Sequence, residues 1–530
     1  MKNIVILYAG SKMNYAFDKI FNEKSAFERA LLWAKNSGEK IIVFTCSENH
    51  NYIEEIRSKL TEENFLNSNN FEIIEKNQWT NLDLSKTISE SCKKNNADFA
   101  LFAWADLPFL NQKLTDELVK MHVDYMAEYT FADGFPYGIT PEVIDGGCAN
   151  ILASLSESVQ KNVGEKLASR DGLFAIMKGD INSFEIETLV AEKDYRLLRF
   201  EFECSSKINF VACKNLFEKI GGDEAKIGEP YELCDIAESS LEIQKTIPAF
   251  YNIQISSKYN HKSIYNPIYK IEKYSEMLKS AGDMDFESFK ALVKKINDFS
   301  QKAVVSLSCW GEPLLNPKFL DFAKEVLNYE NLTLLVETDG ICLTEEIAKN
   351  LADFNGRIDW IILLDSMDKN QYSQIHNCST EDFDKAVASV MILEKYFPHH
   401  VYPQMTRMKM NENNLESFFR FWKEPSSPSQ GELIIQKYDK FCAELSDEKS
   451  ADLSPLVRNA CWHLRRDFVV LADGSVPLCR DLSFGEILGN AFKEELPLVW
   501  AKIDSFLQEH LNKNYSEKCR MCDEYYTFNF

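Results

Sequence analysis

The chain has 530 residues, of which 45% are hydrophobic and 12% aromatic, and its formal net charge is −23. A chain of this length exceeds one core, so we expect two to four domains. The negative charge argues against bulk attraction to nucleic acid or anionic lipid. The longest apolar runs, at Asp98–Leu110 and Trp360–Leu364, are shorter than a membrane-spanning helix. We therefore expect neither nucleic acid nor membrane as a partner.

The first residues, MKNIVILYAG, hold one lysine and a brief apolar run, which favours a first β-strand over a signal peptide. We expect a cytoplasmic protein. Its 14 cysteines then indicate metal ligands and buried thiols rather than disulfides. Ten cysteines are scattered singly and are expected in the core: Cys46, Cys92, Cys148, Cys204, Cys213, Cys234, Cys309, Cys342, Cys378 and Cys442.

Residues 1–235 alternate strand and helix signals. Strands are expected at Lys2–Leu7, Lys40–Cys46 and Asp98–Ala103, with a helix over Ser25–Asn36. This alternation predicts a mostly parallel α/β sheet with ligands at the carboxyl ends of its strands.

Two features lie at such ends. Gly10 follows the first strand, where a glycine lets backbone N–H groups approach a phosphate, and Lys12 or Lys19 offsets the phosphate charge. A plain strand-to-helix turn is the alternative. Asp106 follows an apolar strand, where a carboxylate suits Mg²⁺. Its alternative role is a helix cap or turn residue before Pro108.

These features resemble the cytidylyltransferase-type nucleotidyltransferase fold, a GT-A or Rossmann-like sheet. The resemblance rests on DLPF at Asp106–Phe109, FPYGITPEV at Phe135–Val143 and the segment Asp194–Phe210. It implies that Gly10 and the lysines hold a triphosphate, that Asp106 and Glu203 hold Mg²⁺, and that the stretch with Glu142 lies near a sugar pocket. The family has an aspartate where this chain has Glu203.

Residues 245–423 show a second βα alternation. A strand at Ala249–Ser256 runs into a loop, and AVVSLSCWGEPLLNP follows at Ala303–Pro317. Three further strand-and-loop pairs follow, at Leu332–Thr344, Asp359–Ser366 and Thr406–Asn414. This order resembles the partial TIM barrel of radical SAM enzymes, whose sites lie at the carboxyl ends of the strands. In that family the GGEP element binds the methionyl amino group of S-adenosylmethionine, and Gly311, Glu312 and Pro313 match it.

The loop after the first barrel strand departs from the family. The CxxxCxxC spacing places Tyr259, Ser263 and Asn266 at the three cysteine positions, with Tyr265 at the aromatic position. A [4Fe–4S] cluster with one open iron needs three thiolates, and these donors do not suit it. We therefore expect no radical SAM activity here, and we expect the three residues to share a pocket with Glu312. Binding of S-adenosylmethionine stays an open question.

Residues 424–460 are expected to be a linker, and 455–530 a small third domain. A strand at Asp467–Leu471, a hairpin turn and a second strand deliver Cys479, and a helix is expected around Pro497–Leu511. Four thiols can close a tetrahedral site, and their spacing fits either zinc or an iron–sulfur cluster: Cys461, Cys479, Cys519 and Cys522.

The order C…DGxVxxC…LGN…W…CxxC resembles the SPASM domain, which implies one auxiliary [4Fe–4S] cluster on the four cysteines. His463 lies close to Cys461, and we expect it at the surface or behind a ligand. The whole layout resembles the spiro-SPASM family. Two functions follow: a nucleotidyltransferase-like domain that activates a sugar or sugar acid, or a non-catalytic or redox-sensing iron–sulfur protein. The expected partner is a nucleotide- or sugar-like small molecule, or a protein.

Overall fold

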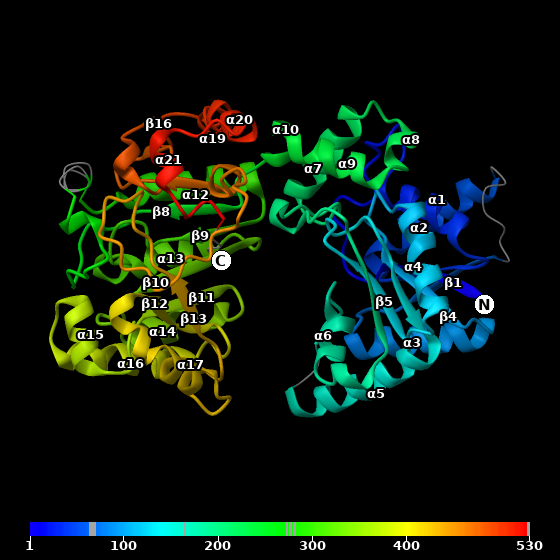
Figure 1. Ribbon diagram of the computed structural model, residues 1–530, viewed down its shortest axis with the longest axis horizontal. Coiled ribbons are helices and arrows are strands. Elements are labelled where there is room, and N and C mark those ends of the chain that lie inside the picture. The colour runs from blue at the N-terminus through cyan, green and yellow to red at the C-terminus, as the bar shows by residue number, and fades with distance from the viewer. Residues whose placement is uncertain (63–69, 164–165, 272–273, 275–277, 279–281, 527–530) are drawn as a thin grey trace. The chain divides into compact units, whose positions relative to one another are not determined.

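The computed structural model describes residues 1–62, 70–163, 166–271, 274, 278 and 282–526 (Figure 1). Its chain divides into two compact units, 1–244 and 245–530. None of the described helices is long and apolar enough to cross a membrane. All fourteen thiols are free, and eight of the ten expected core cysteines are buried, whereas Cys342 and Cys378 are partly exposed.

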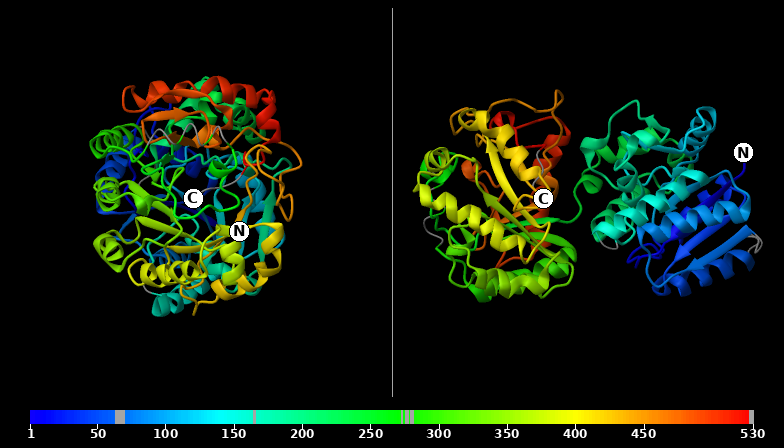
Figure 2. Two further views of the ribbon diagram at one scale, coloured as in Figure 1. Left: turned by 90° about the vertical axis from the view of Figure 1, so that its left-hand side faces the viewer. Right: turned by 90° about the horizontal axis from the view of Figure 1, so that it is seen from below.

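The first unit is built on one seven-stranded sheet with the order β3-β2-β1-β4-β6-β5-β7. Its strands are β1 (Asn3–Ala9), β2 (Ile41–Thr45), β3 (Phe71–Glu75), β4 (Phe99–Trp104), β5 (Tyr129–Asp133), β6 (Glu142–Asp145) and β7 (Ile186–Val190). All neighbours are parallel except β6, which is antiparallel to β4 and β5. The central strand β4 is buried along its whole length, because helices cover both faces of the sheet (Figure 2).

The helices that cover this sheet follow its strands in the sequence. The helix α1 (Ala26–Ser37) packs on α4 (Gln112–Asp124), and α3 (Asn81–Asn95) packs on α5 (Gly146–Val163). A capping box starts α1 where the sequence predicts a helix: the Ser25 hydroxyl accepts from the Glu28 N–H at 3.1 Å. The remaining helices are α2 (Ser47–Glu62), α6 (Gly172–Lys178), α7 (Lys207–Lys219), α8 (Glu224–Ile227), α9 (Pro230–Ser239) and α10 (Leu241–Gln244).

The second unit contains a seven-stranded parallel sheet with the order β13-β12-β11-β10-β9-β8-β14. Its strands are β8 (Phe250–Ile253), β9 (Ala303–Ser306), β10 (Leu332–Thr338), β11 (Ile358–Leu363), β12 (Val401–Arg407), β13 (Ile434–Lys437) and β14 (Asp467–Val470). The first four lie where the sequence predicts barrel strands, whereas β12 begins five residues before the predicted segment Thr406–Asn414 and overlaps it only at Thr406 and Arg407. Helices follow them around the outside of the sheet: α12 (Phe286–Ser300), α13 (Phe319–Leu327), α14 (Glu345–Leu351), α15 (Lys369–His376), α16 (Thr380–Glu394) and α17 (Leu415–Lys423) (Figure 2).

Two features of the C-terminal part differ from expectation. The predicted linker 424–460 contains β13, which extends the sheet beyond β12. The strand β14, expected in a separate third domain, pairs with β8 of the barrel, with Asp467 opposite Phe250. This pairing satisfies backbone groups that β8 would otherwise leave free at the edge of the sheet. The barrel and the C-terminal region therefore lie in one unit.

The rest of the C-terminal region is small. The hairpin turn expected after Leu471 forms, but β15 (Ser475–Pro477) pairs with β16 (Ile487–Asn490). The single helix expected around Pro497–Leu511 is two helices, α19 (Leu496–Ala501) and α20 (Asp504–Leu511), separated at Lys502 and Ile503. The short helices α18 (His463–Arg466) and α21 (Glu517–Met521) carry or flank the cysteines.

Candidate functional site

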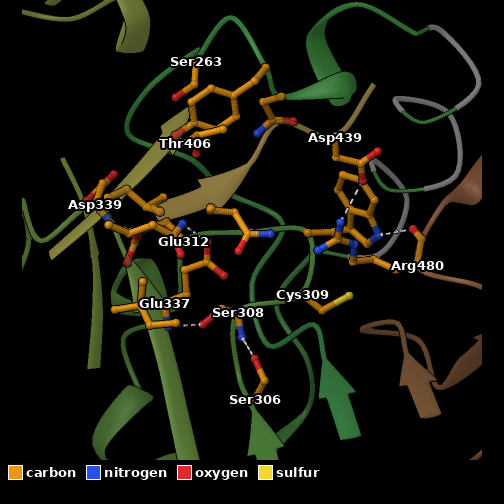
Figure 3. A pocket seen from close by; sticks show the side chains of 18 of the residues that line it. Ser263, Ser306, Ser308, Cys309, Glu312, Glu337, Asp339, Thr406, Asp439 and Arg480 are labelled. Carbon is orange, nitrogen blue, oxygen red and sulfur yellow. Dashed lines mark hydrogen bonds and ion pairs between the residues drawn. The ribbon is translucent and has the colours of Figure 1, made fainter. Parts of the chain in front are cut away.

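A cavity of about 420 Å³ in the second unit opens at the carboxyl ends of the barrel strands (Figure 3). Every strand from β8 to β13 contributes lining residues. Its volume is within the range of small-molecule sites. Parallel strands place their exit loops at the same edge, so residues far apart in the sequence meet here.

The three positions that replace cluster cysteines line this cavity together with Glu312, as expected. Each of the three has a structural contact. The Ser263 hydroxyl lies 3.0 Å from Nδ1 of His376. The Asn266 side chain accepts from the N–H of Ile268 at 3.0 Å, and the Tyr259 ring packs edge-on against Tyr269. These side-chain contacts hold the loop in place.

The Gly311-Glu312-Pro313 turn holds the exits of β8, β9 and β10 together. The Glu312 carboxylate accepts from the Thr338 hydroxyl at 2.6 Å and from the N–H groups of Asp339 and Leu314 at 3.0 Å. Burial, together with the charge of Asp339, raises the pKa of Glu312 well above its usual range. The backbone is so close that a Cβ on Gly311 would lie 1.7 Å from the Ser256 carbonyl oxygen.

A buried network that the sequence did not reveal supports the wall of the cavity. Nε2 of His376, at the end of α15, lies 3.1 Å from Oδ2 of Asp365. The Tyr265 hydroxyl donates to the same oxygen at 2.7 Å. His376 and Asp365 are 1% and 0% exposed. Tyr265 and Asp365 are 100 positions apart, so local pattern carries no signal of their contact.

Acidic and basic groups face each other across the cavity. Arg480 lines it, and its Nη2 donates to Asp439 at 2.9 Å (Figure 3). Burial raises the pKa of Glu337 above its usual value, and the charge of Arg480 opposes that rise. The Gln404 amide donates to Glu337 at 3.4 Å. The cavity therefore offers a fixed cation on one side and a buried carboxyl group on the other.

The structure brings the four predicted metal-ligand cysteines together. Burial raises the pKa of Cys461 to about 12, and Cys522 and Cys519 are near enough to add to the rise. Burial likewise raises the pKa of Cys479, and the nearby Cys461 and Cys522 add to that rise. Backbone N–H groups of Asp481 and Glu524 donate to the sulfurs of Cys479 and Cys522 at 3.4 Å.

Four thiols gathered in this way could close a zinc site or hold an iron–sulfur cluster. The N–H donors to Cys479 and Cys522 match a cluster, because hydrogen bonds to cysteine sulfur tune iron–sulfur centres.

Two further residues lie beside the four cysteines. Both ring nitrogens of His463 are engaged, with Asp467 at 2.6 Å and the Glu524 carbonyl at 2.9 Å, as expected for a residue behind a ligand. Cys442, expected as an isolated core thiol, hydrogen-bonds to Cys522 and lowers the pKa of Cys522 to about 7. The sequence missed this fifth thiol because it lies outside the C-terminal pattern.

In the first unit the predicted carboxylates Asp106 and Glu203 meet at one arginine. Nη2 of Arg170 lies 2.6 Å from Oδ2 of Asp106, and Nε lies 2.6 Å from Oε2 of Glu203. Asp106 and Glu203 are 1% and 4% exposed. The guanidinium also stacks on Trp104, with its carbon 4.3 Å from the ring centroid. Arg170 was not among the predicted site residues.

The predicted phosphate loop leaves the same edge of the sheet as Asp106. The Ala105 N–H donates to the Tyr8 carbonyl at 2.9 Å, so β1 and β4 end side by side. Lys12 and Lys19 are exposed. A Cβ on Gly10 would lie 2.5 Å from Trp79 and 2.6 Å from Tyr8. Aromatic packing thus explains this glycine without a phosphate.

Comparison with known proteins gives the C-terminal assignment. Residues 461–523 match the SPASM family, described as an iron-sulfur cluster-binding domain. An uncharacterized protein of Treponema pallidum (strain Nichols) is 37% identical over 370 residues, which cover 68% of this chain and 98% of that protein. The tungsten-containing aldehyde ferredoxin oxidoreductase cofactor-modifying protein of Pyrococcus furiosus is 32% identical over 72 residues, 14% of this chain and 20% of its own length.

Solved structures resemble each part of the chain at low identity. BtrN in complex with AdoMet and 2-DOIA is 17% identical and covers 53% of this chain and 94% of its own, with a TM-score of 0.35. A cytidylyltransferase from Leptospira borgpetersenii is 15% identical and covers 44% and 98%, with a TM-score of 0.33. The assignment therefore rests on the sequence matches: this chain belongs to the same family as the Treponema pallidum protein, and it ends in a SPASM iron–sulfur cluster-binding domain.

Proposed function

We propose that the second unit binds a sugar- or nucleotide-like small molecule in the barrel cavity and carries one [4Fe–4S] cluster directly beside it. A single observation carries this proposal. Arg480 lines the cavity, and it directly follows Cys479, one of the four cysteines that would hold the cluster. A change at the cluster would therefore reach a ligand in the cavity through two consecutive residues, Cys479 and Arg480.

The lining of the cavity supports a polar, hydroxyl-rich ligand. Ser306, Ser308 and Thr406 contribute hydroxyl groups, and Gln404 contributes an amide (Figure 3). Hydroxyl and amide groups match the donors and acceptors of a sugar. Arg480 supplies a cation that suits a phosphate or carboxylate on the same molecule.

The expected chemistry of this unit is binding rather than radical generation. Tyr259, Ser263 and Asn266 supply no thiolate for a cluster at the barrel loop. Glu312, which the resemblance assigns to S-adenosylmethionine, is occupied by Thr338 and by backbone N–H groups. When bound, the C-terminal cluster would supply a structural or one-electron redox centre. The role of the chain's own residues is to hold the ligand and to fix Arg480 against Asp439.

Anaerobic purification with iron, sulfide and zinc analysis tests the metal part. We expect about four iron and four sulfide per chain, lost in Cys519→Ser and retained in Cys342→Ser, a partly exposed thiol outside the four. A colourless preparation with zinc in place of iron would contradict the cluster. About eight irons per chain would overturn the reasoning about Tyr259, Ser263 and Asn266.

Binding to the cavity needs a separate measurement. Calorimetric titration with a panel of nucleoside diphosphate sugars and sugar phosphates is expected to find a ligand whose affinity falls in Arg480→Gln. Asp439→Asn should weaken it less, because Asp439 acts by orienting Arg480. The exposed Arg420→Gln serves as the matched control. If no member of the panel binds, or Arg480→Gln binds equally well, the cavity proposal fails.

A second candidate function belongs to the first unit, and the meeting of Asp106 with Glu203 supports it. We propose nucleotidyl transfer, in which a sugar hydroxyl or phosphate attacks the α-phosphate of a nucleoside triphosphate and pyrophosphate leaves. Asp106 and Glu203 would hold Mg²⁺, while Lys12 or Lys19 offsets phosphate charge. Arg170 would have to turn away from both carboxylates to admit the metal.

Pyrophosphate release from each nucleoside triphosphate, with Mg²⁺ and a panel of sugar phosphates, tests this candidate. Turnover that Asp106→Asn abolishes is the expected result. The exposed Asp116→Asn variant should leave turnover unchanged. If no combination turns over, and Asp106→Asn leaves nucleotide binding intact, the first unit is not a nucleotidyltransferase.

A further inference from the structure

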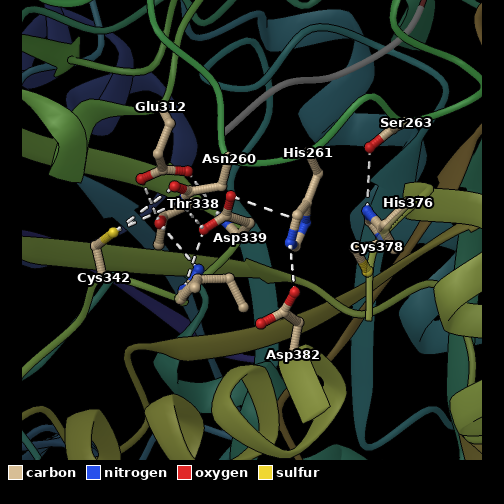
Figure 4. A network of polar contacts seen from close by, with 12 residues as sticks. Asn260, His261, Ser263, Glu312, Thr338, Asp339, Cys342, His376, Cys378 and Asp382 are labelled. Atoms are coloured by element: carbon tan, nitrogen blue, oxygen red, sulfur yellow. Dashed lines mark hydrogen bonds and ion pairs between the residues drawn. The ribbon is translucent and has the colours of Figure 1, made fainter. Parts of the chain in front are cut away.

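We propose that His261, Cys378 and Asp382 form a site for a divalent cation of the zinc type at the rim of the barrel cavity. One potential ligand atom from each residue lies within 4.8 Å of the others (Figure 4). His261 also lines the cavity. The site is separate from the four C-terminal cysteines and goes beyond the functions proposed above.

The state of His261 points to a ligand. Its side chain is more than nine-tenths buried, and neither ring nitrogen has a hydrogen-bond partner among the described residues. A buried polar group without a partner is destabilising and is uncommon in folded proteins. Nε2 lies 3.5 Å from Oδ2 of Asp382, too far for a good hydrogen bond and suited to a cation between the two atoms (Figure 4).

The fold fixes the other two ligands relative to each other. Asn377 ends α15 with a left-handed backbone, φ 51°, which turns the chain so that Cys378 precedes α16. Asp382 lies in the first turn of α16. The Asp382 carboxylate pairs with exposed Lys385 at 2.8 Å through Oδ1, and this leaves Oδ2 toward His261. The Cys378 thiol donates to the Ser379 carbonyl at 3.5 Å, a weak hydrogen bond that a metal-bound thiolate would give up.

The surroundings of His261 match those of metal-binding histidines. Such histidines usually direct their second nitrogen at a carboxylate. Nδ1 of His261 faces Oδ2 of Asp339 at 3.9 Å. Asp339 is itself held by the Asn260 amide at 3.1 Å and by the Ile341 N–H at 3.0 Å (Figure 4).

The donor set selects the class of cation. A nitrogen, a thiolate and a carboxylate oxygen together suit Zn²⁺, whereas Mg²⁺ and Ca²⁺ prefer oxygen ligands alone. Three protein ligands leave a fourth position for water or a bound molecule, as in catalytic zinc sites. With His261 on the cavity wall, that position would serve a ligand in the cavity.

Zinc binding by the anaerobic, cluster-containing full chain tests the proposal. Iron content is measured in the same samples, so that zinc at vacant C-terminal cysteines is recognised. Equilibrium dialysis is expected to give one zinc per chain, lost in His261→Gln, Cys378→Ser and Asp382→Asn. Cys342→Ser and the exposed His399→Gln are the matched controls and should keep it. A large excess of Mg²⁺ should not displace the metal.

Cobalt substitution reports on the ligands directly. The difference spectrum on adding Co²⁺ should show a thiolate-to-metal charge-transfer band that Cys378→Ser removes. Asp339→Asn is expected to weaken affinity about tenfold to a hundredfold while keeping the band, because Asp339 acts through His261. If His261→Gln fails to fold, Asp382→Asn, at a partly buried position in the first turn of α16, serves as the test instead. Wild-type protein without a zinc equivalent, or undiminished zinc in Asp382→Asn and Cys378→Ser, would overturn the proposal.

Discussion

The hydroxyl of Ser263 lies 3.0 Å from Nδ1 of His376, where the resembled radical SAM loop would carry a cysteine. His376 is 1% exposed, and its other nitrogen faces Asp365. The serine is therefore a structural partner of a buried histidine. A cysteine position has become part of the polar network that holds the barrel loop.

Ser263→Ala should destabilise the second unit by about 1–3 kcal/mol, because it leaves Nδ1 of His376 buried without a partner. Urea unfolding measures the change. Ser417→Ala, at an exposed serine of the same unit, should stay within about 0.5 kcal/mol of wild type. Equal effects of the two substitutions would show that the Ser263–His376 contact contributes nothing.

Gly311→Ala should destabilise the same unit by about 3 kcal/mol or more, since the new Cβ would lie 1.7 Å from the backbone oxygen of Ser256. Thermal unfolding measures it. At Gly179, φ is −64° and an added Cβ would lie 3.3 Å from the Ile176 oxygen, so Gly179→Ala should cost less than about 1 kcal/mol. A stable Gly311→Ala variant would mean that the turn can open.

The sequence predicted those strands whose residues are apolar on both faces. Runs such as Asp98–Ala103 and Asp359–Ser366 overlap β4 and β11, because a strand covered by helices needs no polar alternation. It missed β13, which is four residues long and follows a Pro- and Ser-rich stretch. It did not reveal that β14 pairs with β8, since a contact across more than 200 residues leaves no local trace.

The candidate site was predictable only where a motif fixes spacing. The four C-terminal cysteines and Glu312 belong to such motifs. Arg170 meets Asp106 across 64 positions, and His376 meets Ser263 across 113, so neither contact has a spacing to recognise. Long-range polar partners depend on how loops meet at a sheet edge, which a single sequence does not encode locally.

Glu142→Gln should change the pH dependence of stability of the first unit. Burial raises the pKa of Glu142 from 4.5 to about 7, and a hydrogen bond from Tyr129 opposes the rise. Between pH 4.5 and 7 the unfolded chain loses this proton while the native state keeps it, so stability falls as pH rises. We expect a loss on the order of 1–3 kcal/mol across this window that Glu142→Gln lacks.

Urea unfolding at several pH values between these limits measures that slope. The exposed Glu90→Gln variant of the same unit is the control and should keep the wild-type slope. A slope that is the same in Glu142→Gln and wild type would show that Glu142 ionises alike in both states.

Arg170→Ala should destabilise the first unit by about 3–5 kcal/mol, because it leaves Asp106 and Glu203 buried together without a cation. Millimolar Mg²⁺ should raise the melting temperature of this variant more than that of wild type, since the metal can take the place of the guanidinium. Arg196→Ala removes an arginine that pairs on the surface with Asp133, and it should change stability far less, because water screens that pair. A variant indifferent to Mg²⁺ would contradict a metal site on the two carboxylates.

Cys442→Ser should retain iron, whereas Cys522→Ser should lose it. Cys442 hydrogen-bonds to Cys522 but lies outside residues 461–523, which match the SPASM domain. Its thiol therefore acts as a neighbour that tunes a ligand rather than as a ligand, and serine keeps the hydrogen-bonding group.

Iron and sulfide per chain, with the reduction potential of the bound cluster, distinguish the two roles. Full iron with a shifted potential is the expected result for Cys442→Ser. If instead Cys442→Ser loses iron while one of the four cysteine variants keeps it, the ligand set includes Cys442. The cluster site would then extend into the segment after β13, which the sequence assigned to a linker.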